Sequence, residues 1–139
     1  MAYVSLDSDQ IKKAHKKHKY TKEQVLQLEQ CMDPKTGPLY FMKKFMKIQH
    51  PTKGEMPFKP FAYQERLIEA YNSHRFSISM LPRQTGKTTC ASGYLIWYAM
   101  FRPDSQILIA AHKYAGASDI MSRVRYAYEM LPSWIKAGV

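Results

Sequence analysis

The chain is 139 residues long and carries 21 lysines and arginines against 11 aspartates and glutamates, a formal net charge of +10. This length suits one domain with its own core, and the positive balance favours a polyanionic partner, nucleic acid before an acidic membrane. The N-terminus lacks the apolar run of a signal peptide, and no apolar stretch is long enough to span a bilayer. We therefore expect a soluble, intracellular protein with no membrane partner. Cys31 and Cys90 are far apart in no metal-type spacing, which predicts two free thiols.

Lysine-rich segments make up the first part of the chain. Residues 1–20 include the run IKKAHKKHK, whose like charges three and four apart weaken a helix. We expect a mobile basic arm that is solvated, with contact to DNA phosphates as the less favoured alternative. Residues 21–59 are expected to form a helical approach to the core.

Two helices are predicted within this approach. Thr21 and Gln24 can form a capping box that opens a helix through about residue 30. Residues 39–48, LYFMKKFMKI, place apolar side chains in a helical stripe with the lysines opposite. The segments DPKTGP and HPTKGEMP on either side of this stripe are typical of turns.

From residue 60 onward, helix and strand patterns alternate. The pattern predicts an amphipathic helix at 61–73, a strand at 75–80, a helix at 87–101, a buried strand at 105–110 and a helix at 114–131. This order is typical of an α/β doubly wound fold in which helices flank a parallel sheet. With only two confident strands the sheet would be incomplete, and an unpaired apolar edge invites aggregation.

The loop between the first strand and its following helix reads LPRQTGKTT, from Leu81 to Thr89. Loops of this kind aim backbone N–H groups at a phosphate above a helix N-terminus. Gly86 would let the backbone wrap closely, Lys87 would reach the β- and γ-phosphate oxygens, and the Thr88 hydroxyl would coordinate Mg²⁺. Leu81 stands where the usual first glycine belongs, so the front half of the loop is unusual.

Pro82, Arg83 and Gln84 make that front half stiff and charged. An arginine held over the phosphates could contact the γ-phosphate and stabilise charge in the transition state, an effect of about 10³–10⁵ in phosphoryl transfer. The alternative for Arg83 is a surface arginine paired with a nearby acid.

These residues resemble the variant Walker A loop of the large terminase subunit of tailed bacteriophages, of the contractile-tailed type. That family has Arg-Gln before GKT and no leading glycine, and FAYQERLI is similar to its adenine-recognition element. The similarity runs from about Thr21 to Val139. It implies a P-loop (RecA/ASCE-like) ATPase domain at residues 60–139, with Gln64 reading adenine and Arg83 and Lys87 acting in catalysis. The implied contacts to ATP come from Gln64, Arg83, Gln84, Thr85, Gly86, Lys87, Thr88 and Thr89, with Thr88 also holding Mg²⁺.

The resemblance also implies a function. It indicates the N-terminal part of an ATP-driven motor that packages double-stranded DNA into procapsids. The implied partners are DNA, the small terminase subunit, the portal and other copies in a ring, in the host cytoplasm and transiently at the portal. Family members need an apolar strand ending in Asp-Glu, whose aspartate holds Mg²⁺ and whose glutamate activates water. No such pair occurs in these residues, so we expect negligible ATP hydrolysis by this chain alone.

Two rival interpretations stay open from the sequence. One is another DNA-dependent P-loop ATPase such as a helicase, although helicase loops usually carry a second glycine where Gln84 and Thr85 stand. The other is a non-catalytic module that binds nucleotide or DNA. Lys113, Arg123 and Arg125 could face DNA or a neighbouring subunit, or could form a solvated helix face.

Overall fold

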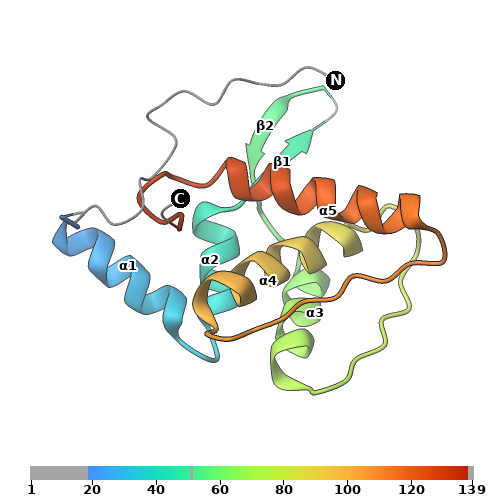
Figure 1. Cartoon of the computed structure of the whole chain (residues 1–139), viewed down its shortest axis with the longest axis horizontal. Coiled ribbons are helices and arrows are strands. Elements are labelled where there is room, and N and C mark those ends of the chain that lie inside the picture. The colour runs from blue at the N-terminus through green and yellow to red at the C-terminus, as the bar shows by residue number, and fades with distance from the viewer. Residues whose placement is uncertain (1–18, 51, 138–139) are drawn as a thin grey trace.

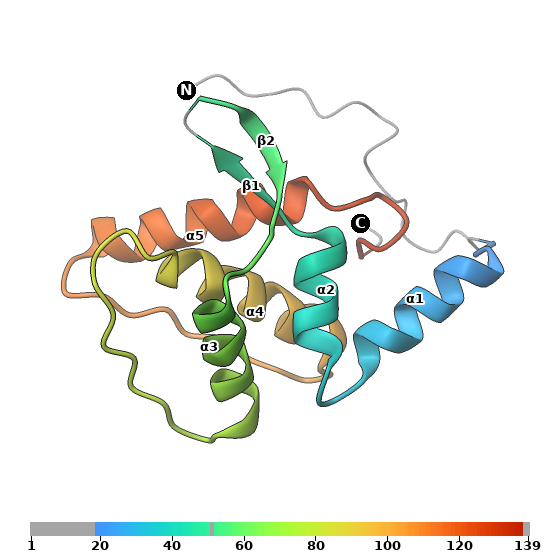
Figure 2. The same ribbon diagram turned by 180° about the vertical axis from the view of Figure 1, so that it is seen from behind.

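The structure, a computed structural model, describes residues 19–50 and 52–137. The described residues form five helices and one two-stranded sheet. In chain order these are α1 (Lys22–Met32), α2 (Gly37–Phe45), β1 (Lys47–His50), β2 (Gly54–Pro57), α3 (Ala62–Ser73), α4 (Lys87–Phe101) and α5 (Tyr114–Glu129). Helix α4 packs against α2, α3 and α5, while α1 packs on α2 at one end and the β1–β2 hairpin projects from the helices (Figure 1; from behind, Figure 2). Helix α4 is therefore the centre of the fold.

Helix α1 begins at the predicted capping box. The Thr21 hydroxyl accepts a hydrogen bond from the Gln24 amide at 3.2 Å, and the Gln24 side chain accepts one from the Thr21 amide at 3.0 Å. After the helix, the Asp33 carboxylate accepts from the amides of Thr36 and Lys35, both at 2.8 Å, which lowers the pKa of this carboxyl group. The capping prediction is confirmed, and the predicted turn after it begins with an aspartate that holds the backbone in place.

The helix predicted over residues 39–48 is only partly right. Helix α2 starts earlier, at Gly37, and ends at Phe45, and the next residues form β1 instead. Strand β1 pairs antiparallel with β2, with Lys47 opposite Pro57, and the Phe58 amide donates to the Met46 carbonyl at 2.9 Å. The predicted turn HPTKGEMP thus supplies a strand as well as a turn. The helical periodicity of residues 39–48 could not reveal that β1 pairs with β2, because β2 lies beyond these residues, on the other side of the turn.

The core lies where α2 crosses α4. Its buried apolar side chains are Cys31, Phe41, Met42, Phe45, Met46, Phe58, Leu67, Ile68, Cys90, Ile96, Trp97, Ala127, Leu131 and Ile135. At Gly93, an added Cβ would lie 2.5 Å from side-chain atoms of Met42 and of Met46, so glycine permits the close approach of these methionines to α4. Both cysteines are free, as predicted, and the structure also shows that both are buried. Burial raises the pKa of Cys31 to about 12 and that of Cys90 to about 11.

The two predicted parallel strands are the main correction to the sequence-based fold. Residues 75–80 and 105–110 contain no strand in the structure and join no sheet, and the one sheet among the described residues is the antiparallel hairpin. Several of their apolar side chains are exposed to solvent, with Phe76 83%, Ile78 95%, Met80 93% and Leu108 92% exposed. A parallel strand needs neighbours on its edges, and no described segment pairs with either one. The part of the chain that the structure describes therefore contains no P-loop parallel sheet.

Such exposure of large apolar side chains leads to a prediction about self-association. We expect the purified chain to form concentration-dependent oligomers, because unpaired apolar segments template pairing with other chains. Replacing Ile78 and Leu108 with lysine should shift the population toward monomer in size-exclusion chromatography with light scattering. Ser77→Lys with Gln106→Lys is the control, since it adds the same two charges to the same two segments and replaces no apolar side chain. A wild-type chain that stays monomeric at high concentration would contradict the prediction.

Among the described residues, no helix combines the length and apolar character needed to cross a membrane.

Candidate nucleotide-binding site

The loop of residues 81–86 leads directly into the N-terminus of α4. Gly86 occupies the N-cap position with φ 77° and ψ 17°, the left-handed region, and Gln84 has φ 61°. No side chain caps the first turn of α4, so the first N–H groups of the helix remain available to an acceptor. An uncapped helix N-terminus behind a tight loop is the arrangement that backbone-bound phosphates require.

Lys87 is the first residue of α4, and its side chain folds back over the loop. Its Nζ donates to the carbonyl oxygens of Leu81 at 2.7 Å and Pro82 at 2.6 Å. The Thr85 hydroxyl also donates to the Pro82 carbonyl, at 2.9 Å. The ammonium group therefore lies at the loop and is held by backbone oxygens. If an anion bound there, the Lys87 ammonium group would exchange its neutral carbonyl acceptors for charged oxygens, which form stronger hydrogen bonds.

Gln64 on α3 reaches the same loop from 21 residues earlier in the chain. Its side chain is 6% exposed, its Oε1 accepts from the Phe61 amide at 3.0 Å, and its Nε2 donates to the Thr85 carbonyl at 3.0 Å. The structure thus brings the predicted adenine-reading residue to the predicted phosphate loop. Its contact with adenine stays a prediction, and the amide already has one partner for its oxygen and one for its nitrogen.

Tyr63 is a site residue that the sequence analysis missed. Its hydroxyl donates to the Thr85 carbonyl at 2.9 Å, beside the hydrogen bond from Gln64. Two side chains of α3 therefore hold one carbonyl of the loop. The sequence could have indicated Tyr63 only by its position, because it precedes Gln64 in the first turn of the same helix. No chemical motif distinguishes it from a tyrosine that packs in the core.

The remaining predicted site residues lie around the loop in different environments. Arg83 and Gln84 are exposed, whereas Thr88 and Thr89 are half-buried in the first turn of α4. No ion pair joins Arg83 to a carboxylate of a described residue, so the alternative of a paired surface arginine is not seen there.

The residues of the loop fit a phosphate group. A Cβ added at Gly86 would lie 2.6 Å from Gln64 Nε2, so a larger residue at this position would displace the Gln64 side chain. Backbone N–H groups, the Lys87 ammonium group and the Thr88 hydroxyl together provide donors, a positive charge and a hard oxygen ligand. That set suits a polyphosphate with Mg²⁺.

Residues 78–138 match the family described as terminase large subunit, T4likevirus-type, N-terminal. This stretch is similar to the N-terminal part of terminase large subunits. It contains the whole loop, α4 and α5, so the resemblance drawn from the GKT motif is confirmed for the part of the chain that carries the motif. Gln64 and Tyr63 lie before the matched residues.

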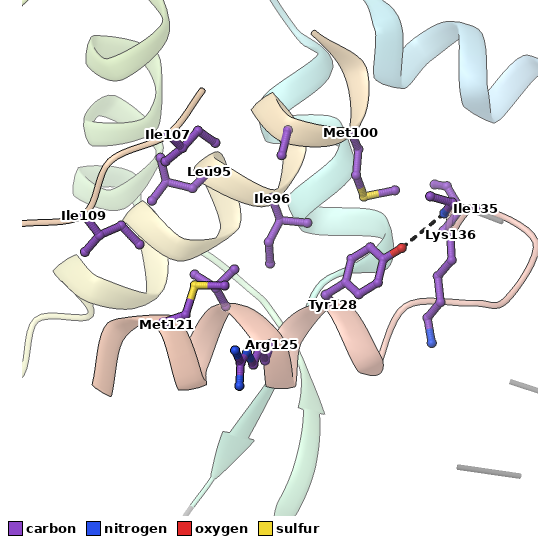
Figure 3. A pocket seen from close by; sticks show the side chains of 13 residues that line it. Leu95, Ile96, Met100, Ile107, Ile109, Met121, Arg125, Tyr128, Ile135 and Lys136 are labelled. Carbon is purple, nitrogen blue, oxygen red and sulfur yellow. Dashed lines mark hydrogen bonds between the residues drawn. The ribbon is translucent and has the colours of Figure 1, made fainter. Parts of the chain in front are cut away.

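An apolar groove runs between α4 and α5, the two helices within the matched residues. Figure 3 shows Leu95, Ile96 and Met100 of α4 facing Met121 and Tyr128 of α5. The side chains of residues 107 and 109, two isoleucines from the extended segment, line the same groove, which has a volume of about 580 Å³. Alternate residues of a predicted strand therefore contact the helices even though the sheet is absent.

Lys113, Arg123 and Arg125, the basic residues that could face DNA or a neighbouring subunit or form a solvated helix face, do not gather in one place. Arg125 lines the apolar groove, and Arg123 lines a second hollow beside β1, where it pairs with Asp119 at 3.2 Å. Lys113 is exposed at the N-cap of α5. Residues two apart on a helix point in different directions, so Arg123 and Arg125 cannot contact one ligand face together. Their roles remain predictions.

Proposed function

We propose that the chain is the N-terminal part of the ATP-driven motor that packages double-stranded DNA into phage procapsids. The observation that carries this proposal is the terminase match of residues 78–138, a stretch that includes the GKT loop. In the structure this loop precedes the N-terminus of α4, which has no side-chain cap. The net charge of +10 agrees with a DNA partner.

In this function the loop holds the triphosphate. Gly86 permits the close backbone approach, Lys87 exchanges its two carbonyl partners for phosphate oxygens, and Thr88 offers its hydroxyl to Mg²⁺. Bound Mg²⁺ would supply positive charge against the phosphate oxygens. Arg83 lies exposed in the loop, where a guanidinium group is free to turn toward the γ-phosphate. Further contacts are proposed from Gln64, Gln84, Thr85 and Thr89.

The same function implies a larger assembly. The exposed apolar segments 75–80 and 105–110 would enter the parallel sheet of a P-loop ATPase domain when further strands pair with them. The partners proposed for the assembled motor are DNA, the small terminase subunit, the portal and neighbouring copies in a ring. Its place is the host cytoplasm, with transient binding at the portal.

The proposal is tested by Lys87→Ala. We expect the full chain to bind Mg-ATP weakly and the variant to lose at least about tenfold in affinity, because a charge-assisted hydrogen bond contributes about 1.5–3 kcal/mol. Isothermal titration calorimetry with Mg-ATP measures the change.

Lys44→Ala is the matched control for this experiment. Lys44 is an exposed lysine in the last turn of α2 and forms no ion pair with a described residue. Its loss should leave Mg-ATP affinity unchanged. Equal binding by wild type and Lys87→Ala would overturn the assignment of the loop.

A further inference from the structure

A polar hollow lies between the C-terminal ends of α3 and α4, at the other end of α4 from the loop. It has a volume of about 470 Å³, and its lining includes His74, Arg75, Tyr94, Tyr98 and Arg102. These side chains come from two helices and the residues that follow them, so the fold, not a local motif, brings them together. None of them was predicted to take part in a site.

The two arginines of the hollow have no acidic partner among the described residues. The Arg102 guanidinium carbon lies 5.4 Å from the centre of the Trp97 ring, and that of Arg75 lies 5.2 Å from the Phe76 ring. No ion pair joins either arginine to a carboxylate within residues 19–50 and 52–137. Aromatic contacts orient a guanidinium group and leave its in-plane N–H donors free for an oxygen ligand.

The floor of the hollow is held by hydrogen bonds and ring packing. The Tyr94 hydroxyl donates to the Tyr71 carbonyl at 3.3 Å, and Asn72 Nδ2 donates to the Pro34 carbonyl at 2.6 Å. The rings of Tyr94 and Tyr98 pack with centroids 6.1 Å apart. The arginines therefore extend from a frame that ties α3, α4 and the turn after α1 together, which reduces the ordering that a ligand must impose.

We propose that this hollow binds backbone phosphates of duplex DNA, an inference that rests on the proposed packaging function. Two unpaired guanidinium groups match phosphate geometry, and the Tyr98 hydroxyl adds a neutral donor. Helix α4 has 15 residues, so its C-terminal end, where Arg102 lines the hollow, lies about 22 Å along the helix from the nucleotide loop. DNA and nucleotide thus occupy opposite ends of one helix and do not compete for the same residues.

The test measures binding of a labelled duplex to the full chain by fluorescence anisotropy over a series of salt concentrations. The double variant Arg75→Gln with Arg102→Gln should bind about tenfold more weakly at moderate salt. The slope of log affinity against log salt should decrease by about two, close to one for each lost phosphate contact. Tyr98→Phe should weaken binding to a smaller degree and leave the slope unchanged, since it removes no charge.

Arg66→Gln is the matched control, because Arg66 is an exposed arginine on α3 outside the hollow. Arg66→Gln should change DNA affinity little, since it removes one positive charge from the chain but no contact to a phosphate. Melting curves confirm that each variant is folded, and Arg75→Gln alone tests the proposal if Arg102→Gln unfolds. Wild-type affinity and slope in the hollow variants, or a loss per arginine equal to that of Arg66→Gln, would overturn the proposal. A wild-type chain that binds no duplex would overturn it too, whereas loss of Mg-ATP binding alone would not.

Discussion

Trp97→Ala is expected to lower the free energy of unfolding by about 3–5 kcal/mol, the usual cost of removing a buried aromatic side chain. Trp97 is 1% exposed at the centre of α4, and its Nε1 donates to the Cys31 carbonyl at 2.7 Å. The indole therefore fixes the end of α1 against α4. Natural domains are stable by only about 5–15 kcal/mol, so this substitution should remove a large fraction of the total stability.

Urea denaturation followed by circular dichroism measures this loss. Trp97→Phe separates its two causes, because phenylalanine keeps most of the apolar volume but leaves the Cys31 carbonyl without its donor, at a cost of about 1–3 kcal/mol. Leu26→Ala is the control, since Leu26 is exposed on α1 and its loss should change stability little. A Trp97→Ala variant as stable as Leu26→Ala would show that the described core is wrong.

Gly86→Val is expected to abolish Mg-ATP binding while the helices remain folded. Gly86 has φ +77°, a conformation in which a β-branched residue is strained by about 1–3 kcal/mol. Its Cβ would also lie 2.6 Å from Gln64 Nε2, and this contact would displace the side chain that holds the Thr85 carbonyl. The loop would lose both its backbone conformation and its support from α3.

Gly54→Val is the control that separates strain from collision. Gly54 has φ +71°, close to that of Gly86, but a Cβ there meets no atom within 4 Å. We expect a similar backbone strain from Gly54→Val in denaturation, with Mg-ATP binding in calorimetry retained. If Gly86→Val binds Mg-ATP as well as Gly54→Val does, the loop does not bind phosphate through the described conformation.

Much of the helical structure could be predicted from local pattern. The predicted ranges 61–73, 87–101 and 114–131 correspond closely to α3, α4 and α5, and the Thr21 capping box begins α1. These features depend on side chains three or four residues apart, which the sequence displays directly. The two strand predictions were wrong because a strand depends on a partner that lies far away in the sequence. An apolar run such as 105–110 indicates a strand only if a partner pairs with it, and β1 formed where the hairpin turn supplied one.

The sequence by itself determined the chemistry of the candidate site. The order Gly86, Lys87, Thr88 placed a flexible backbone, an ammonium group and a hydroxyl at the start of a helix, because neighbours in sequence are neighbours at a helix N-terminus. Only the tertiary structure decided what surrounds that loop. Packing of α3 on α4 brought Tyr63 and Gln64 to the Thr85 carbonyl and put the C-terminal ends of both helices side by side. Such contacts join residues more than twenty positions apart, and their free energy comes from burying shared apolar surface, which no local pattern records.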